Sequence, residues 1–154
     1  MEATISKTVT IAADADLVWS LVTDLPRMGE FSPENLGGRW VGGADGPAVG
    51  ARFRGVNHNG DKRWKTFSTV VEYVPGMLLT FDVRTSFGLR VSRWSYQVEP
   101  TEAGCRLTER WYRVGNLMVQ RYLGPRVTGR TDRPGFNVES IEHTLAAVKA
   151  RAEQ

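Results

Sequence analysis

A series of short strand-like segments separated by turn residues occupies residues 36–114, and it restricts the possible folds more than any other feature of the chain. Asn59-Gly60, Pro75-Gly76 and the stretch 101–104 mark tight turns between the segments. Strands joined by tight turns pair as antiparallel neighbours. The pattern therefore predicts a meandering antiparallel sheet.

The last segment of the chain has the spacing of one long amphipathic helix, from roughly residue 134 to residue 152. A single apolar stripe runs along it, formed by Val138, Ile141, Leu145, Val148 and Ala152. Such a stripe must be buried, and the apolar face of the sheet needs a cover. We therefore expect the helix on the concave face of the sheet, with a pocket where the two diverge.

The first forty residues predict one more strand and two short helices. Apolar and polar residues alternate up to about Ala12, as in a half-buried strand. Asp14 can cap the helix that follows, and Pro26 limits its length. The stretch "PRMGEF" then predicts a short helix or turn over an edge of the core. The expected apolar face of the first helix is Leu17, Val18, Leu21 and Val22.

Composition fits one globular domain over residues 1–154, with 41% hydrophobic and 24% charged residues. From the elements above, the predicted fold class is α+β, with a seven-stranded antiparallel sheet, two short helices after the first strand and a long C-terminal helix.

Cys105 is the only cysteine, which suits a reducing compartment. No signal sequence or apolar span is apparent, so we expect a cytoplasmic protein without stable membrane insertion. The oligomeric state stays open.

The formal net charge is only +3, but residues 106–133 contain seven arginines against Glu109 and Asp132. Such a segment could contact nucleic acid, an anionic membrane or an acidic partner. Without a nucleic-acid-binding motif or dense lysine clusters, we expect no nucleic-acid partner. In the simpler interpretation, these arginines lie on solvent-exposed faces of strands and loops.

Candidate site residues follow from strand alternation. If Leu107 faces the core, Cys105, Glu109 and Trp111 share its face, which places a carboxylate among apolar groups. A buried carboxylate must pair, for example with Arg113 or Arg90, or change its protonation state. The predicted ligand-binding residues are Phe53, Trp64, Phe81, Trp94, Tyr96, Glu109 and Trp111. The aromatic residues can equally form an ordinary core.

Four stretches, in their order along the chain, resemble the START-like superfamily, also called SRPBCC. They are "ADLVWSLVTDLPRMGEFSPE", "RWKTFSTVVEYVPGMLLTF", "RWSYQVEPTEAGCRLTERW" and "TLAAVKA". The resemblance is closest to the actinobacterial polyketide cyclase/dehydrase-like branch. It implies a helix-grip fold, in which the sheet grips the final helix around an elongated cavity for hydrophobic ligands.

This superfamily includes lipid carriers, hormone receptors and aromatase/cyclases, so the resemblance leaves function open. The first hypothesis is a carrier or sequestering protein for a small hydrophobic ligand such as a lipid, fatty acid or polyketide. The second is a cyclase or dehydratase with Glu109 as general acid or base. The third is an interaction protein that uses the arginine-rich segment. No catalytic set can be matched residue by residue, and no motif indicates a metal or cofactor.

Residues 116–133 combine apolar side chains that need cover, among them Leu117, Met118, Tyr122 and Leu123, with two glycines and Pro125. This mixture predicts a mobile lid at the mouth of the pocket. The alternative is a helical extension that continues into the C-terminal helix.

Overall fold

The computed structural model describes residues 1–154 and contains one seven-stranded sheet. Its order is β1-β7-β6-β5-β4-β3-β2, and every neighbouring pair is antiparallel. The strands are β1 (Ile5–Ile11), β2 (Asn35–Val41), β3 (Arg52–Asn59), β4 (Lys62–Val74), β5 (Leu78–Thr85), β6 (Arg90–Thr101) and β7 (Gly104–Arg113). The helices are α1 (Ala15–Thr23), η1 (Leu25–Glu30), α2 (Leu117–Tyr122), α3 (Gly124–Thr128) and α4 (Arg133–Ala152).

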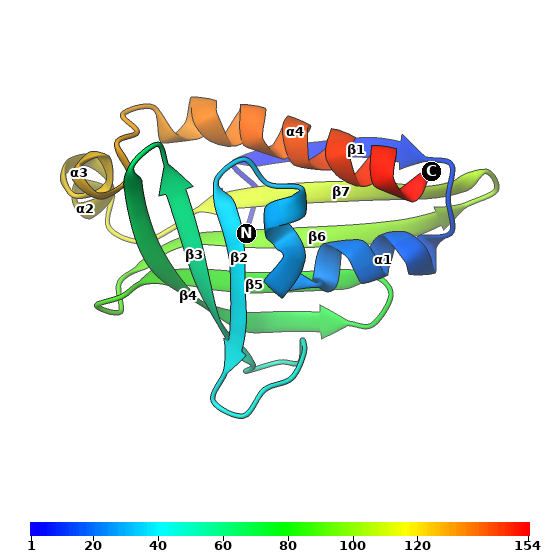
Figure 1. Cartoon of the computed structure of the whole chain (residues 1–154), viewed down its shortest axis with the longest axis horizontal. Helices are drawn as coiled ribbons and strands as arrows, with labels where there is room; N and C mark the ends of the chain where they lie inside the picture. Colours follow the sequence, from blue (N-terminus) through cyan, green and yellow to red (C-terminus); the bar gives the residue numbers. More distant parts are fainter.

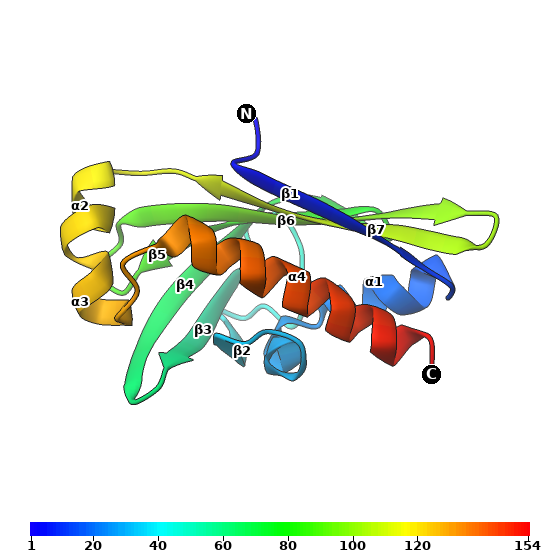
Figure 2. The same ribbon diagram turned by 90° about the horizontal axis from the view of Figure 1, so that it is seen from above.

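The sheet curls around α4, which lies inside the curve (Figures 1 and 2). Four residues of the expected stripe are buried there, and Val138 is half-buried. The prediction of a helix-grip α+β fold is therefore confirmed. None of the helices combines the length and hydropathy that a membrane span requires. The buried stripe residues are Ile141, Leu145, Val148 and Ala152.

The two short helices follow β1 as expected, with one correction. Asp14 caps α1 by accepting a 2.9 Å hydrogen bond from the backbone N–H of Asp16. Val18 and Val22 are buried and Leu21 packs against the core, but Leu17 is exposed, because the core covers only one side of α1. The predicted apolar face was therefore too wide.

Glycines allow η1 to lie directly against β2. Gly37 has a φ of 99°, and a Cβ at this position would stand 2.2 Å from the carbonyl oxygen of Pro26. A Cβ on Gly29 would stand 2.7 Å from the carbonyl oxygen of Leu36. This close contact buries Leu25 and Met28 at one end of the core, which explains why large apolar residues lie among helix breakers here.

Residues 116–133 form two short helices that are separate from α4, so the predicted continuous extension is wrong. Gly129, with a φ of 71°, ends α3 in the left-handed conformation. Asp132 then caps α4 by accepting a hydrogen bond from the backbone N–H of Gly135. The chain thus turns before α4 begins, and α2 and α3 lie across its N-terminal end (Figure 2).

Candidate functional site

A cavity of about 920 Å³ lies between the concave face of the sheet, the N-terminal half of α4 and the α2–α3 segment. Met28 and Leu25 of η1 contribute to its wall on the core side. Along α4, the buried aliphatic residues belong to the hydrophobic core, whereas other buried residues of the same helix line the cavity. Its volume is within the range of sites for small organic molecules.

Large aromatic side chains form the sheet wall of this cavity. Trp64 projects from β4, Phe81 from β5, Trp94 and Tyr96 from β6, and Trp111 from β7. The ring centroids of Phe81 and Tyr96 are 6.5 Å apart, as are those of Trp94 and Trp111. Such contacts between aromatic side chains hold the rings in place and provide a broad apolar surface.

Phe53 is the one predicted site residue that does not line the cavity. It is buried in the main core, where its ring packs edge-on against Trp40 at a centroid distance of 5.3 Å. At this point β3 pairs with β2, and an inward-facing residue of β3 contacts the hydrophobic core rather than the cavity.

Glu109 faces the interior, as the alternation of β7 predicts, and only 3% of it is exposed. It lies directly opposite Tyr96 in the antiparallel pairing of β6 and β7. The Tyr96 hydroxyl donates a 3.0 Å hydrogen bond to Oε1 of Glu109, and it also lies 3.9 Å from Sδ of Met28. Oε2 of Glu109 is buried and has no hydrogen-bond partner. One carboxyl oxygen of this cavity-lining residue therefore lacks a hydrogen-bond partner within the protein.

Burial raises the pKa of Glu109 to about 8, and the hydrogen bond from Tyr96 offsets only part of this effect. The pKa of Tyr96 is also raised, by burial and by the neighbouring carboxyl group. At neutral pH both groups are therefore mainly protonated. Glu109 is then a neutral acid that can donate a hydrogen bond or a proton.

Neither expected arginine pairs with Glu109. Arg113 lies four residues farther along β7, and its Nε donates a 3.1 Å hydrogen bond to Oε1 of Gln120. Arg90 pairs instead with Asp82, at 3.1 Å, beside an irregularity in the pairing of β5 and β6. The carboxyl group therefore lacks a cationic partner that would oppose the rise in its pKa caused by burial.

The α4 wall of the cavity is polar, which the apolar stripe of this helix does not predict. Asn137, Ser140 and Thr144 are buried side chains of α4 that line the cavity opposite the aromatic wall. Polar residues beside an apolar stripe ordinarily face solvent, so periodicity alone gives no reason to place them inside. Their spacing of three and four residues was the available signal, because it follows one face of a helix.

Two arginines, Arg130 in the connection before α4 and Arg133 at its first residue, form an ion-pair cluster at the edge of the cavity. Nε of Arg130 and Nη1 of Arg133 donate to the Glu34 carboxylate at 2.6 and 2.8 Å. The Arg130 guanidinium also lies 3.3 Å from the ring centroid of Phe136. This cluster ties the end of the α2–α3 segment to the stretch before β2. One carboxylate thus pairs with both arginines and only partly neutralises them, so the cluster keeps a net positive charge.

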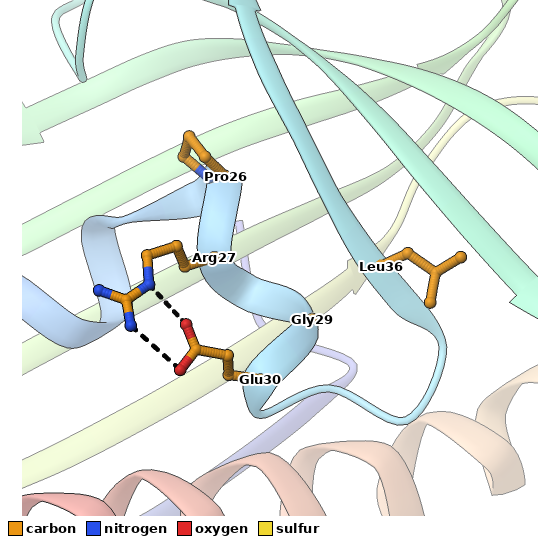
Figure 3. A pocket seen from close by; sticks show the side chains of 5 residues that line it. All are labelled: Pro26, Arg27, Gly29, Glu30 and Leu36. Atoms are coloured by element: carbon orange, nitrogen blue, oxygen red, sulfur yellow. Dashed lines mark hydrogen bonds and ion pairs between the residues drawn. The ribbon is translucent and has the colours of Figure 1, made fainter.

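A smaller pocket beside η1 has fewer groups that could bind a ligand. Pro26, Arg27, Gly29, Glu30 and Leu36 surround it (Figure 3). Arg27 and Glu30 bind each other across 2.5 Å, and both belong to the exposed surface. The shallow position and the internal ion pair leave no group free for a ligand.

The chain belongs to the family described as polyketide cyclase / dehydrase and lipid transport, whose model matches residues 2–153. A search of curated proteins finds no match. This family explains why the sequence resembles START-like proteins.

Solved structures with the same fold come from proteins of low sequence identity. Protein CV1439 from Chromobacterium violaceum superposes with a TM-score of 0.72 at 13% identity, over 99% of both chains. The di-domain ARO/CYC StfQ from the steffimycin biosynthetic pathway gives 0.71 at 16% identity, over 97% of this chain and 50% of that one. The Polyketide_cyc-like protein Cgl2372 from Corynebacterium glutamicum gives 0.59 at 28% identity, over 94% and 88%.

Proposed function

We propose that this protein is a cytoplasmic carrier or sequestering protein that binds one small hydrophobic ligand in the cavity between the sheet and α4. The single observation that carries this proposal is an aromatic-lined cavity of about 920 Å³ that contains one unpartnered carboxyl oxygen. Apolar burial would supply the affinity, and a few polar groups would fix the orientation of the ligand. Membership of a family described by lipid transport supports the same conclusion.

The two walls define the chemistry of the ligand. An apolar or aromatic body would lie along Trp94 and Trp111, and oxygen atoms would face Asn137, Ser140 and Thr144 on α4. Because Glu109 is neutral at pH 7, it would donate a hydrogen bond to a ligand oxygen through Oε2. A lipid, a fatty acid or a polyketide-like molecule has these features.

Native mass spectrometry of protein purified from its own host tests this proposal. We expect an intact mass larger than that of the chain by one small organic molecule, which organic solvent releases. The same protein, once stripped, should bind a fluorescent fatty-acid probe. A ligand-free protein that also binds no hydrophobic probe would overturn the proposal.

A second candidate function is catalysis by Glu109, and its raised pKa is the observation that favours it. A pKa near the working pH is what a general acid or base needs. In an aldol closure, the carboxylate would take a proton from a carbon between two carbonyl groups, and that carbon would attack a third carbonyl. The Glu109 acid would then return the proton to the new alkoxide oxygen. The aromatic wall would fold the chain for this attack.

Incubation of a soluble polyketone with the protein separates the two candidates. A carrier returns the compound unchanged, whereas a cyclase releases a cyclised product. If Glu109 is the acid and base, Glu109→Gln should retain binding of the compound and lose its conversion. Conversion that survives in Glu109→Gln would rule out this catalytic role.

A further inference from the structure

Large apolar side chains are exposed around the opening of the cavity. Four of them, Phe87, Leu117, Leu123 and Val127, are also part of the cavity wall. Extensive apolar exposure is unfavourable in water and marks a surface that another molecule covers. We call this surface the mouth patch, and it consists of Phe87, Leu117, Met118, Tyr122, Leu123 and Val127.

Polar contacts hold the segment that carries most of these apolar groups. The side-chain amide of Asn59 donates a 2.8 Å hydrogen bond to the carbonyl oxygen of Thr128. Lys62 donates at 3.2 Å to the carbonyl oxygen of Arg126. Gln120 of α2 donates to backbone carbonyl groups at the ends of β6 and β7. The segment is thus attached at both ends while its apolar side chains remain exposed.

Figures 1 and 2 show α2 and α3 at one end of the molecule, where they form its outer surface. Met118 and Tyr122 are 62% and 58% exposed and do not line the cavity. They are therefore exposed on the same segment that lines the cavity, without being part of the cavity wall.

Basic side chains lie beside the mouth patch and give this end of the protein a positive charge. All of them are exposed, and none takes part in an ion pair with a carboxylate of the protein. Residues 117–127 contain no acidic residue, so the exposed groups of this segment are apolar, cationic or neutral. An anionic lipid surface combines acyl chains with negative head groups. It is therefore complementary to the apolar side chains of the mouth patch and to the basic side chains beside them. The basic residues are Lys62, Arg63, Lys65, Arg121 and Arg126.

We propose that the mouth patch docks this protein onto membranes that contain anionic lipids. Apolar side chains enter the interface between head groups and acyl chains, while the arginines and lysines contact lipid phosphates. The cavity then opens against the bilayer, and a hydrophobic ligand passes between membrane and protein without crossing water. This last step rests on the proposed carrier function, whereas docking itself does not.

Co-sedimentation with vesicles tests the docking surface. Wild-type protein should bind vesicles of phosphatidylcholine mixed with phosphatidylglycerol, and binding should weaken in high salt. It should bind pure phosphatidylcholine vesicles far less. Met118→Ser combined with Tyr122→Ser should lower the affinity for the anionic vesicles by about tenfold or more, because two buried apolar groups are lost.

A matched control uses Val49→Ser combined with Met77→Ser, two equally exposed apolar residues outside the mouth patch. This control should bind the anionic vesicles like wild type. Both double variants should bind a soluble fluorescent fatty-acid probe in the absence of vesicles, since none of the four residues lines the cavity. Probe binding thus tests the cavity independently of docking.

Two outcomes would overturn the docking proposal. One is a wild-type protein that binds no anionic vesicles, including the case in which an acidic protein binds the patch instead. The other is an equal loss of vesicle binding in the mouth variant and in the control variant.

Discussion

The hydroxyl of Tyr96 lies 3.0 Å from Oε1 of Glu109, and the two residues face each other directly across β6 and β7. This hydrogen bond leaves Oε2 as the only carboxyl oxygen without a partner, deep in an otherwise aromatic wall. The pair therefore holds a neutral acid in a fixed orientation at the cavity surface. This arrangement supports both candidate functions.

The first prediction concerns the pH dependence of stability in Glu109→Gln. The folded-state pKa of about 8 lies above the usual 4.5, so between these values the folded protein keeps a proton that the unfolded chain has released. The contribution of Glu109 to stability is therefore largest below about pH 4.5 and is lost as the pH rises through 8. Glutamine mimics the protonated acid and has no such loss.

We thus expect Glu109→Gln to match wild type at pH 5 and to exceed it at pH 9 by roughly 2 to 5 kcal/mol. Denaturant unfolding at both pH values measures the difference. A variant that is less stable than wild type at pH 9 would indicate an ionised, paired Glu109.

The second prediction is that Tyr96→Phe raises the pKa of Glu109 further. The Tyr96 hydrogen bond is the contact that lowers this pKa, so its removal leaves burial unopposed. Stability should fall by about 1 kcal/mol at neutral pH. Carboxyl carbon NMR titration measures the pKa directly. Tyr112→Phe on the opposite face of β7 is the control and should leave the Glu109 signal unchanged. An unchanged pKa in Tyr96→Phe would contradict the account.

Much of this site follows from the turn between β6 and β7. Thr101 pairs with Gly104, so each residue pair along the hairpin is fixed, and Tyr96 falls opposite Glu109. Alternation places both side chains inward. Sequence alone therefore predicts the inward carboxylate, and the same register could have identified Tyr96 as its partner in place of an arginine.

The rest of the site depends on the curvature of the sheet and the position of α4. Irregular pairing at Asn35/Gly37 and Val70/Glu72 accompanies the curl that places Phe53 in the core and Trp64 at the cavity. Bulges of this kind have no reliable sequence signature. The buried position of Asn137 likewise depends on where α4 separates from the sheet, which helical periodicity does not indicate.

The third prediction concerns the contact between η1 and β2. Gly37→Ala should lower stability by about 2 to 4 kcal/mol, because a Cβ would meet the carbonyl oxygen of Pro26 and φ is positive. Gly43→Ala is the control, with a φ of 84° but open space around its Cβ. It should lose only about 1 kcal/mol. Equal losses in thermal or urea unfolding would show that the close contact is unimportant.

The fourth prediction tests the lid hypothesis for residues 116–133. Glu34→Gln removes the carboxylate that binds Arg130 and Arg133, so this segment should open more often. Hydrogen exchange of its amides should accelerate by about tenfold, and a bound hydrophobic ligand should slow it. Glu99→Gln removes the exposed pair with Arg106 and serves as control. If the amides of this segment exchange slowly, and neither Glu34→Gln nor a bound ligand changes their exchange rate, the segment is not a lid.

The central claim is that a hydrophobic ligand binds between the sheet and α4. Ser140→Phe should fill the cavity from its polar wall, while Glu139→Phe places the same side chain on the exposed face of α4. Circular dichroism should show that both variants fold.

Titration with a fluorescent fatty-acid probe is the direct measurement. The account predicts that Ser140→Phe weakens probe binding by about tenfold or more, since the aromatic ring occupies the space of the ligand. Glu139→Phe should bind the probe like wild type. Equal affinity of the two folded variants would contradict the claim and place the ligand elsewhere on the protein.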